Sequence, residues 1–128
     1  MIDHAQATRF AQEWVDCWNR HDVPGVLAHF ADDVVFTSPG AARLVPASGG
    51  IVRGKAALAE YWNRALRQIP ELHFTLIDVY SGIDVVVINY RNHRGQLVNE
   101  VLRFRDDLVV EGHGAYRPIE TEPAPSPR

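Results

Sequence analysis

The apolar residues change their spacing at Pro70, and this change constrains the fold more than any other feature of the sequence. Before Pro70 they recur at intervals of three and four residues, as on one face of a helix. After it, four runs rich in Val, Ile, Leu, Phe and Tyr are separated by short turn segments. Helices followed by an antiparallel meander predict an α+β domain whose helices cover one face of a sheet.

Three helices are predicted before Pro70. Asp3 is expected to cap the first, with Gln6 completing a capping box, and Asp22 is expected to start the second. Pro70 ends the third because proline is not tolerated in a helix interior. The predicted helices run from about Asp3 to Arg20, from Asp22 onward, and from near Gly54 to Pro70.

A short strand is predicted at residues 34–38, between the second and third helices. Residues 39–50, rich in Gly and Pro, are expected to form an unpacked loop that borders a functional site. The four strands predicted after Pro70 span residues 72–81, 84–92, 96–105 and 108–117. A single domain is expected over residues 1–119, followed by a disordered tail at residues 120–128.

Charge and cysteine content exclude several classes of function. The 13 basic and 16 acidic residues give a net charge of -3, so no basic field is expected to attract nucleic acid or an anionic membrane. The lone Cys17 excludes an internal disulfide and a cysteine-based zinc site, and no other metal-ligand spacing is recognisable. Because no apolar run reaches the roughly 20 residues that span a bilayer, we expect a cytoplasmic protein.

Glu100 is the most informative residue, because it shares one face of its strand with Val98, Leu102 and Phe104. A carboxylate on an apolar face is costly unless it is paired, protonated or solvated in a cavity. If Asp106 and Asp107 form the centre of the last turn, partner residue numbers sum to 213 and Glu100 faces His113. A sheet edge or an arginine partner for Glu100, and a purely structural role for His113, are the alternatives.

The register of the preceding hairpin depends on its turn. Gly95 suits the left-handed position of a three-residue loop, which would place Ile88 opposite Glu100 and Tyr90 opposite Val98. A two-residue loop would instead present Asn89 and Val87. The first register is preferred.

The sequence resembles the nuclear transport factor 2-like superfamily, and within it the SnoaL-like and ketosteroid isomerase-like proteins. The resemblance covers residues 4–117 and rests on Phe-Ala-Asp-Asp-Val-Val-Phe at 30–36, Gly-Lys-Ala-Ala-Leu at 54–58 and the terminal Ala115-Tyr116. It implies a cone-shaped barrel of bent antiparallel sheet, closed by the three helices, with an apolar cavity and dimerisation through the outer sheet face. The superfamily contains isomerases, cyclases, dehydratases and non-catalytic adaptors, so the fold does not define a reaction.

The catalytic pattern of ketosteroid isomerases carries over only in part. Those enzymes use an aspartate base with an oxyanion hole formed by a tyrosine and a neutral aspartic acid. The resemblance puts Ser38 at the base, Trp14 at the tyrosine and Glu100 at the neutral acid, with His113 at a pocket position of the last strand. Serine cannot replace a carboxylate base, so steroid isomerisation by the usual route is not expected.

The leading hypothesis is a cofactor-independent proton-transfer enzyme, an isomerase, cyclase or dehydratase, acting on a small hydrophobic carbonyl or phenolic compound. Glu100 and His113 would be catalytic, because one can hold a proton while the other accepts it. The alternative is a non-catalytic module that binds a small ligand or another protein. A homodimer is expected through an outer face bearing Asn99, Val101, Arg103 and Arg105. The expected substrate-binding residues are Trp14, Trp18, Ser38, Tyr61, Trp62, Tyr90, Val98 and Leu102.

Overall fold

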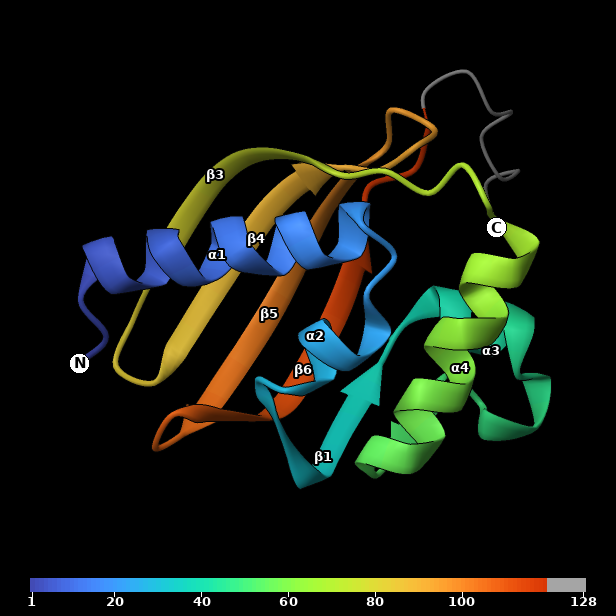
Figure 1. Ribbon diagram of the computed structural model, residues 1–128, viewed down its shortest axis with the longest axis horizontal. Coiled ribbons are helices and arrows are strands. Elements are labelled where there is room, and N and C mark those ends of the chain that lie inside the picture. The colour runs from blue at the N-terminus through green and yellow to red at the C-terminus, as the bar shows by residue number, and fades with distance from the viewer. Residues whose placement is uncertain (120–128) are drawn as a thin grey trace, which may run out of the picture.

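The computed structural model describes residues 1–119 and forms a curved sheet with its helices gathered on one side (Figure 1). The expected tail at 120–128 lies outside the described residues. The helices are α1 (His4–Asn19), α2 (Val23–Leu27), α3 (Pro39–Leu44), α4 (Lys55–Gln68) and the single-turn η1 (Pro46–Ser48). The strands are β1 (Phe30–Thr37), β2 (Ile51–Arg53), β3 (Thr75–Ser81), β4 (Val85–Arg91), β5 (Leu97–Arg105) and β6 (Leu108–Tyr116).

The predicted helix starts are confirmed by their caps. The Asp3 carboxylate accepts hydrogen bonds from the backbone N–H groups of Ala5 and Gln6, which α1 itself leaves without partners. Asp22 caps α2 in the same way by accepting from Gly25. The apolar stripe of α1 faces the core and buries Trp14 and Trp18, along with Ala7, Ala11, Val15 and Cys17.

The prediction of an unpacked loop at residues 39–50 is wrong. The Ser38 hydroxyl accepts a hydrogen bond from the Gly40 N–H at 3.1 Å and so caps α3, whose first residue is proline. Gly40 and Ala41 are buried in this short helix. Gly49 and Gly50 then take positive φ angles that turn the chain into β2, which was not predicted.

All six strands form one sheet in the order β2-β1-β6-β5-β4-β3. The last four pair with one another only in antiparallel fashion, as predicted. The sheet as a whole is mixed, because β1 pairs with β6 in parallel and with β2 in antiparallel orientation. In Figure 1, α1 crosses the sheet while α4 stands beside β1, so both helices cover the same face.

The preferred register of the β4–β5 hairpin is confirmed, with Ile88 opposite Glu100 and Tyr90 opposite Val98. The predicted register of β5 and β6 is correct only next to the turn, where Phe104 pairs with Val109. A bulge then places one extra residue, Val110, in β6.

The bulge shifts every later pair of the β5–β6 ladder by one residue. Glu100 therefore lies opposite Gly114, and His113 lies opposite Val101. Because side chains alternate along a strand, this shift moves His113 to the opposite face from the one predicted. The expected pairing of Glu100 with His113 is wrong for this reason.

Within residues 1–119, no helix combines the length and the apolar character needed to cross a membrane.

Candidate active site

A cavity of about 330 Å³ lies between the inner face of the sheet and helices α1, α3 and α4. Its inner wall is aromatic. Its polar lining comes from α3, α4, the turn between β4 and β5, and the strands β5 and β6. The lining residues that the site uses most are Trp14, Trp18, Ser38, Arg43, Tyr61, Trp62, Phe74, Tyr90, Glu100 and Tyr116.

Glu100 lies in the middle of β5 and points to this inner face. Its side chain is buried, with the residue 5% exposed. The Tyr90 hydroxyl, on the neighbouring strand β4, donates a hydrogen bond to Glu100 Oε1 at 2.9 Å. The second oxygen, Oε2, is also buried and has no hydrogen-bond partner among the described residues. A buried acceptor without a partner is costly, so Oε2 is available for a proton or a ligand.

Burial raises the pKa of Glu100 to about 7, and the hydrogen bond from Tyr90 acts in the opposite direction. Both protonation states of Glu100 are therefore populated near neutral pH. Burial and the neighbouring Glu100 carboxylate also raise the pKa of Tyr90 well above its usual value, so its hydroxyl keeps its proton. A group that can gain or lose a proton near pH 7 is suited to general acid-base chemistry.

Two glycines leave space beside polar groups of the cavity, Gly114 beside the Glu100 carboxylate and Gly40 beside the Tyr61 hydroxyl. A Cβ atom on Gly114 would lie 3.3 Å from Glu100 Oε1 and 3.4 Å from Tyr116 Cε1. A Cβ atom on Gly40 would lie 2.6 Å from the Tyr61 hydroxyl, where no side chain fits. Each glycine thus leaves room beside a polar group of the cavity.

Three hydroxyl groups gather around Gly40: those of Ser38, Tyr61 and Tyr116 all lie within 4 Å of the position that a Cβ atom on Gly40 would take. Burial raises the pKa of Tyr61 and raises that of Tyr116 to about 12, while hydrogen bonding with Ser38 lowers both. The two phenols therefore remain protonated near neutral pH. Protonated hydroxyls at this position can donate to an oxygen atom of a bound molecule that gains negative charge.

Stacked and edge-on rings form the apolar wall. The ring of Phe74 lies 4.3 Å from that of Tyr90 and 5.6 Å from that of Trp14, measured between centroids. Trp18 packs edge-on against Trp62 at 5.0 Å. The indole N–H groups of Trp14 and Trp18 are buried and find no acceptor among residues 1–119. The wall suits a flat apolar molecule.

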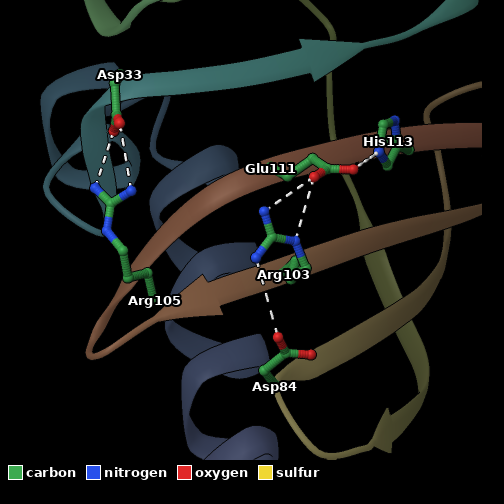
Figure 2. A network of polar contacts seen from close by, with 6 residues as sticks. All are labelled: Asp33, Asp84, Arg103, Arg105, Glu111 and His113. Atoms are coloured by element: carbon green, nitrogen blue, oxygen red, sulfur yellow. Dashed lines mark hydrogen bonds and ion pairs between the residues drawn. The ribbon is translucent and has the colours of Figure 1, made fainter.

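His113 lies outside this cavity, on the outer face of the sheet (Figure 2). Its Nε2 is 2.7 Å from Glu111 Oε2, and its Nδ1 is 2.6 Å from the Thr37 hydroxyl. Arg103 donates to the other oxygen of Glu111 and forms an ion pair with Asp84. The structure therefore joins His113 to an exposed polar network and not to Glu100.

The comparisons with known proteins agree with this architecture. A family model for the SnoaL-like domain matches residues 11–112. The chain belongs to the SnoaL-like family. A SnoaL-like protein of unknown function from Burkholderia thailandensis E264 is 40% identical, with a TM-score of 0.86, and the match covers 91% of this chain and 98% of that one. No curated protein matches.

More distant structures share the fold of the SnoaL-like protein. AclR, a putative hydroxylase from Streptomyces galilaeus, is 22% identical with a TM-score of 0.70, over 90% of this chain and 91% of its own. A putative ketosteroid isomerase from Kribbella flavida DSM 17836 is 17% identical with a TM-score of 0.70, over 95% and 84% of the two chains. Further neighbours have cystatin-like and nuclear transport factor 2-like folds, which confirms the predicted fold class.

The SnoaL-like cavity brings together most of the residues expected to bind substrate. Val98 and Leu102 are exceptions, because they are fully buried in the core and do not line the cavity. The expected residues that do line it are Trp14, Trp18, Ser38, Tyr61, Trp62 and Tyr90, together with Glu100.

Sequence reasoning missed several cavity residues of the SnoaL-like protein. Tyr116 was not among the expected cavity residues. The bulge in β6 turns it to the inner face, and the successive apolar residues Val109 and Val110, which break the strand alternation, are the signal of that bulge. Arg43 lies in α3, where a loop was expected. The turn residues Asn92, His93, Arg94 and Gln96 carried no recognisable motif.

No group of three or more His, Cys, Asp or Glu side chains within residues 1–119 is arranged to hold a metal ion. Cys17, the one cysteine of the SnoaL-like chain, is buried beside α2 as a free thiol. Burial raises the pKa of this thiol, which disfavours the reactive thiolate.

Proposed function

We propose that this SnoaL-like protein is a proton-transfer enzyme of isomerase, cyclase or dehydratase type, acting on a small and mostly apolar carbonyl or phenolic compound. The observation that carries the proposal is the buried Glu100 carboxyl group, whose pKa of about 7 lets it exchange a proton at neutral pH inside an aromatic cavity. Glu100 is the only carboxylic acid among the lining residues within 1–119.

The proposed step begins with Glu100 ionised and a carbonyl compound in the cavity. A carboxylate oxygen of Glu100 takes a proton from the carbon next to the carbonyl group. The electron pair of the broken C–H bond moves to the carbonyl oxygen and forms an enolate. The hydroxyls of Tyr61 and Tyr116 stabilise this oxygen by donating hydrogen bonds, and Glu100 then returns its proton to another carbon or to the oxygen.

Neither Ser38 nor His113 exchanges a proton in this proposal. Ser38 caps α3 and interacts with the two tyrosine hydroxyls, so it organises donors and does not accept a proton. His113 is held on the outer face by Thr37 and Glu111 and cannot act in the cavity from there. Glu100 alone serves as both base and acid.

A non-catalytic small-ligand carrier is the second candidate. It is favoured by Ser38, which stands where the ketosteroid isomerases have their aspartate base, and by the burial of Glu100 Oε2. A carrier would use Glu100 to accept a hydrogen bond from its ligand and would transfer no proton.

Hydrogen exchange from carbon distinguishes the two candidates. A panel of apolar ketones and phenols is incubated in D₂O with the wild type, with Glu100→Gln, and with His113→Gln as a matched control outside the cavity. If the protein is an enzyme, we expect the wild type and H113Q to incorporate deuterium into at least one compound. Exchange by E100Q should be at least roughly 100-fold slower, which is the size of a general-base contribution. Compounds that bind without exchange in the wild type would establish the carrier.

The remaining expectations about partners and location stay predictions. They are a homodimer through the outer face that bears Val101 and Arg103, a cytoplasmic location, and activity without a cofactor. Light scattering at tens of micromolar tests the dimer, and a monomer mass would refute it.

A further inference from the structure

Arg43 is the cation of the cavity that the proposed reaction leaves unused. It lies in the last turn of α3 and lines the same cavity as Tyr61 and Tyr116. Its positive charge lowers the pKa of both phenols, so the guanidinium group lies close enough to act on the two hydroxyls. Arg43 is an exposed residue that also lines the cavity, so an entering ligand can reach it.

Among the described residues, several other arginines have partners that Arg43, which lines the cavity, does not have. Arg103 and Arg105 lie on the outer face and form ion pairs with carboxylates, Arg103 with Glu111 and Arg105 with Asp33 (Figure 2). Arg64, on α4, donates a hydrogen bond to the carbonyl of Leu44. Within residues 1–119, Arg43 has neither an acidic partner nor a hydrogen bond of this kind. An arginine beside a cavity without a carboxylate partner can bind an anion.

The charge of the cavity lining supports the same conclusion. Its cations are Arg43 and Arg94, the latter in the turn between β4 and β5. Its only carboxylic acid within residues 1–119 is Glu100, which lies deep in the cavity and is neutral for part of the time near pH 7. The lining therefore combines two cations, a hydroxyl cluster close to Arg43 and an aromatic wall.

We propose that the natural substrate of this site is an anion, an apolar carbonyl compound that also carries a carboxylate, with the carboxylate bound by Arg43 and the rings of Trp14 and Phe74 holding its apolar body. This inference rests on the proposed function and names its substrate class. Arg43 would hold the charged end in place, while the hydroxyls of Tyr61 and Tyr116 face the carbonyl oxygen and Glu100 faces the acidic C–H bond. Arg43 is thus a specificity-determining residue.

Two probes of nearly identical shape, 2-naphthoate and 2-naphthamide, test the inference because only the first is charged. Calorimetric titration is run at roughly pH 6, where Glu100 is mostly neutral and naphthoate is ionised. We expect the wild type to bind naphthoate about tenfold more tightly than naphthamide, an advantage of roughly 1.4 kcal/mol. Arg43→Gln should remove this advantage and leave naphthamide affinity within about twofold. Arg43→Lys should keep part of it.

Arg67→Gln is the matched control, because Arg67 is exposed on α4, does not line the cavity, and its loss changes the net charge equally. The R67Q protein should keep the full preference for naphthoate. The inference is overturned if naphthamide binds as tightly as naphthoate to the wild type, if neither probe binds, or if R43Q and R67Q lose the preference equally. It is also overturned if R43Q weakens both probes alike.

The two proposals fail in different ways. E100Q should lose deuterium exchange yet keep the preference for naphthoate, because it leaves Arg43 in place. Exchange without anion preference would refute the substrate class alone, and anion preference without exchange would refute the enzyme alone.

Discussion

The Tyr90 hydroxyl donates a hydrogen bond to Glu100 Oε1 at 2.9 Å, between side chains that point to the inner face from neighbouring strands. Tyr90 stabilises the ionised form of Glu100, whereas burial stabilises the neutral form. The balance between these two effects puts the pKa of Glu100 at about 7, far above that of an exposed glutamate. The proposed chemistry depends on this balance.

Replacing Tyr90 with Phe should raise the pKa of Glu100 above 7. The ring is retained, but the hydrogen bond to the carboxylate is lost, and such a bond to a charged group is worth about 1.5 to 3 kcal/mol. We expect the pKa of Glu100 to increase by about one unit or more. The infrared absorption of its protonated carboxyl group, recorded as pH is changed, measures this pKa. Tyr80→Phe, on an exposed tyrosine of β3, is the control and should not move it. Identical midpoints in Y90F and the wild type would show that the hydrogen bond does not act on Glu100.

Glu100→Gln should make the protein more stable at alkaline pH. In the folded protein Glu100 holds its proton up to about pH 7, whereas the ordinary value of 4.5 applies to the unfolded chain. The wild type is therefore most stable relative to E100Q below pH 4.5 and loses stability as pH rises to about 7. The accumulated loss is about 3 kcal/mol. Urea unfolding measures the difference, which should be near zero at acid pH and constant above neutrality. A difference between the two proteins that does not vary with pH would contradict the prediction.

Gly114→Ala should weaken ligand binding without unfolding the protein. The new methyl group would enter the space beside Glu100 Oε1 and Tyr116, where its neighbours must move by a few tenths of an ångström. We expect 2-naphthoate to bind roughly tenfold more weakly, a loss of about 1.4 kcal/mol, by calorimetry. Gly82→Ala is the matched control, because a Cβ there meets nothing closer than 3.8 Å. Equal affinity in G114A and G82A would place the ligand elsewhere.

His113→Gln should leave the titration of Glu100 unchanged, because the two side chains lie on opposite faces of the sheet. The same substitution should raise the pKa of Glu111. This pKa is held below its usual value by a hydrogen bond from His113 and, to a smaller extent, by one from Arg103. Carboxyl NMR follows both groups in one sample. A change in the pKa of Glu100 in H113Q would contradict the placement of the two side chains on opposite faces.

The sequence was sufficient to predict the parts of the fold that depend on local spacing of residues. The caps Asp3 and Asp22, the antiparallel order of the last four strands and the inward direction of Glu100 all follow from local spacing. Glu100 was identified as unusual because a carboxylate interrupts an otherwise apolar face. The position of Tyr90 near it followed from one glycine, Gly95, whose φ of 74° matches the expected turn.

The parts that were missed depend on single residues whose effect is not local. Val110 is one extra residue in β6, yet it reverses the direction of every side chain after it, which removed His113 from the site and brought in Tyr116. Ser38 was expected to bind substrate and to stand where the base is missing. Serine before proline is also a helix start, and the helix that Ser38 caps carries Arg43. Both errors affected the same wall of the cavity.

The proposed chemistry depends on the pKa of Glu100, which can be measured without knowing the substrate. Carboxyl ¹³C NMR of protein labelled in its glutamate side chains, compared with E100Q to assign the resonance, gives the midpoint directly. We expect the Glu100 resonance to titrate near pH 7. A Glu100 resonance that titrates near 4.5, like an exposed glutamate, would contradict the proposed role of this residue as the proton-transfer group.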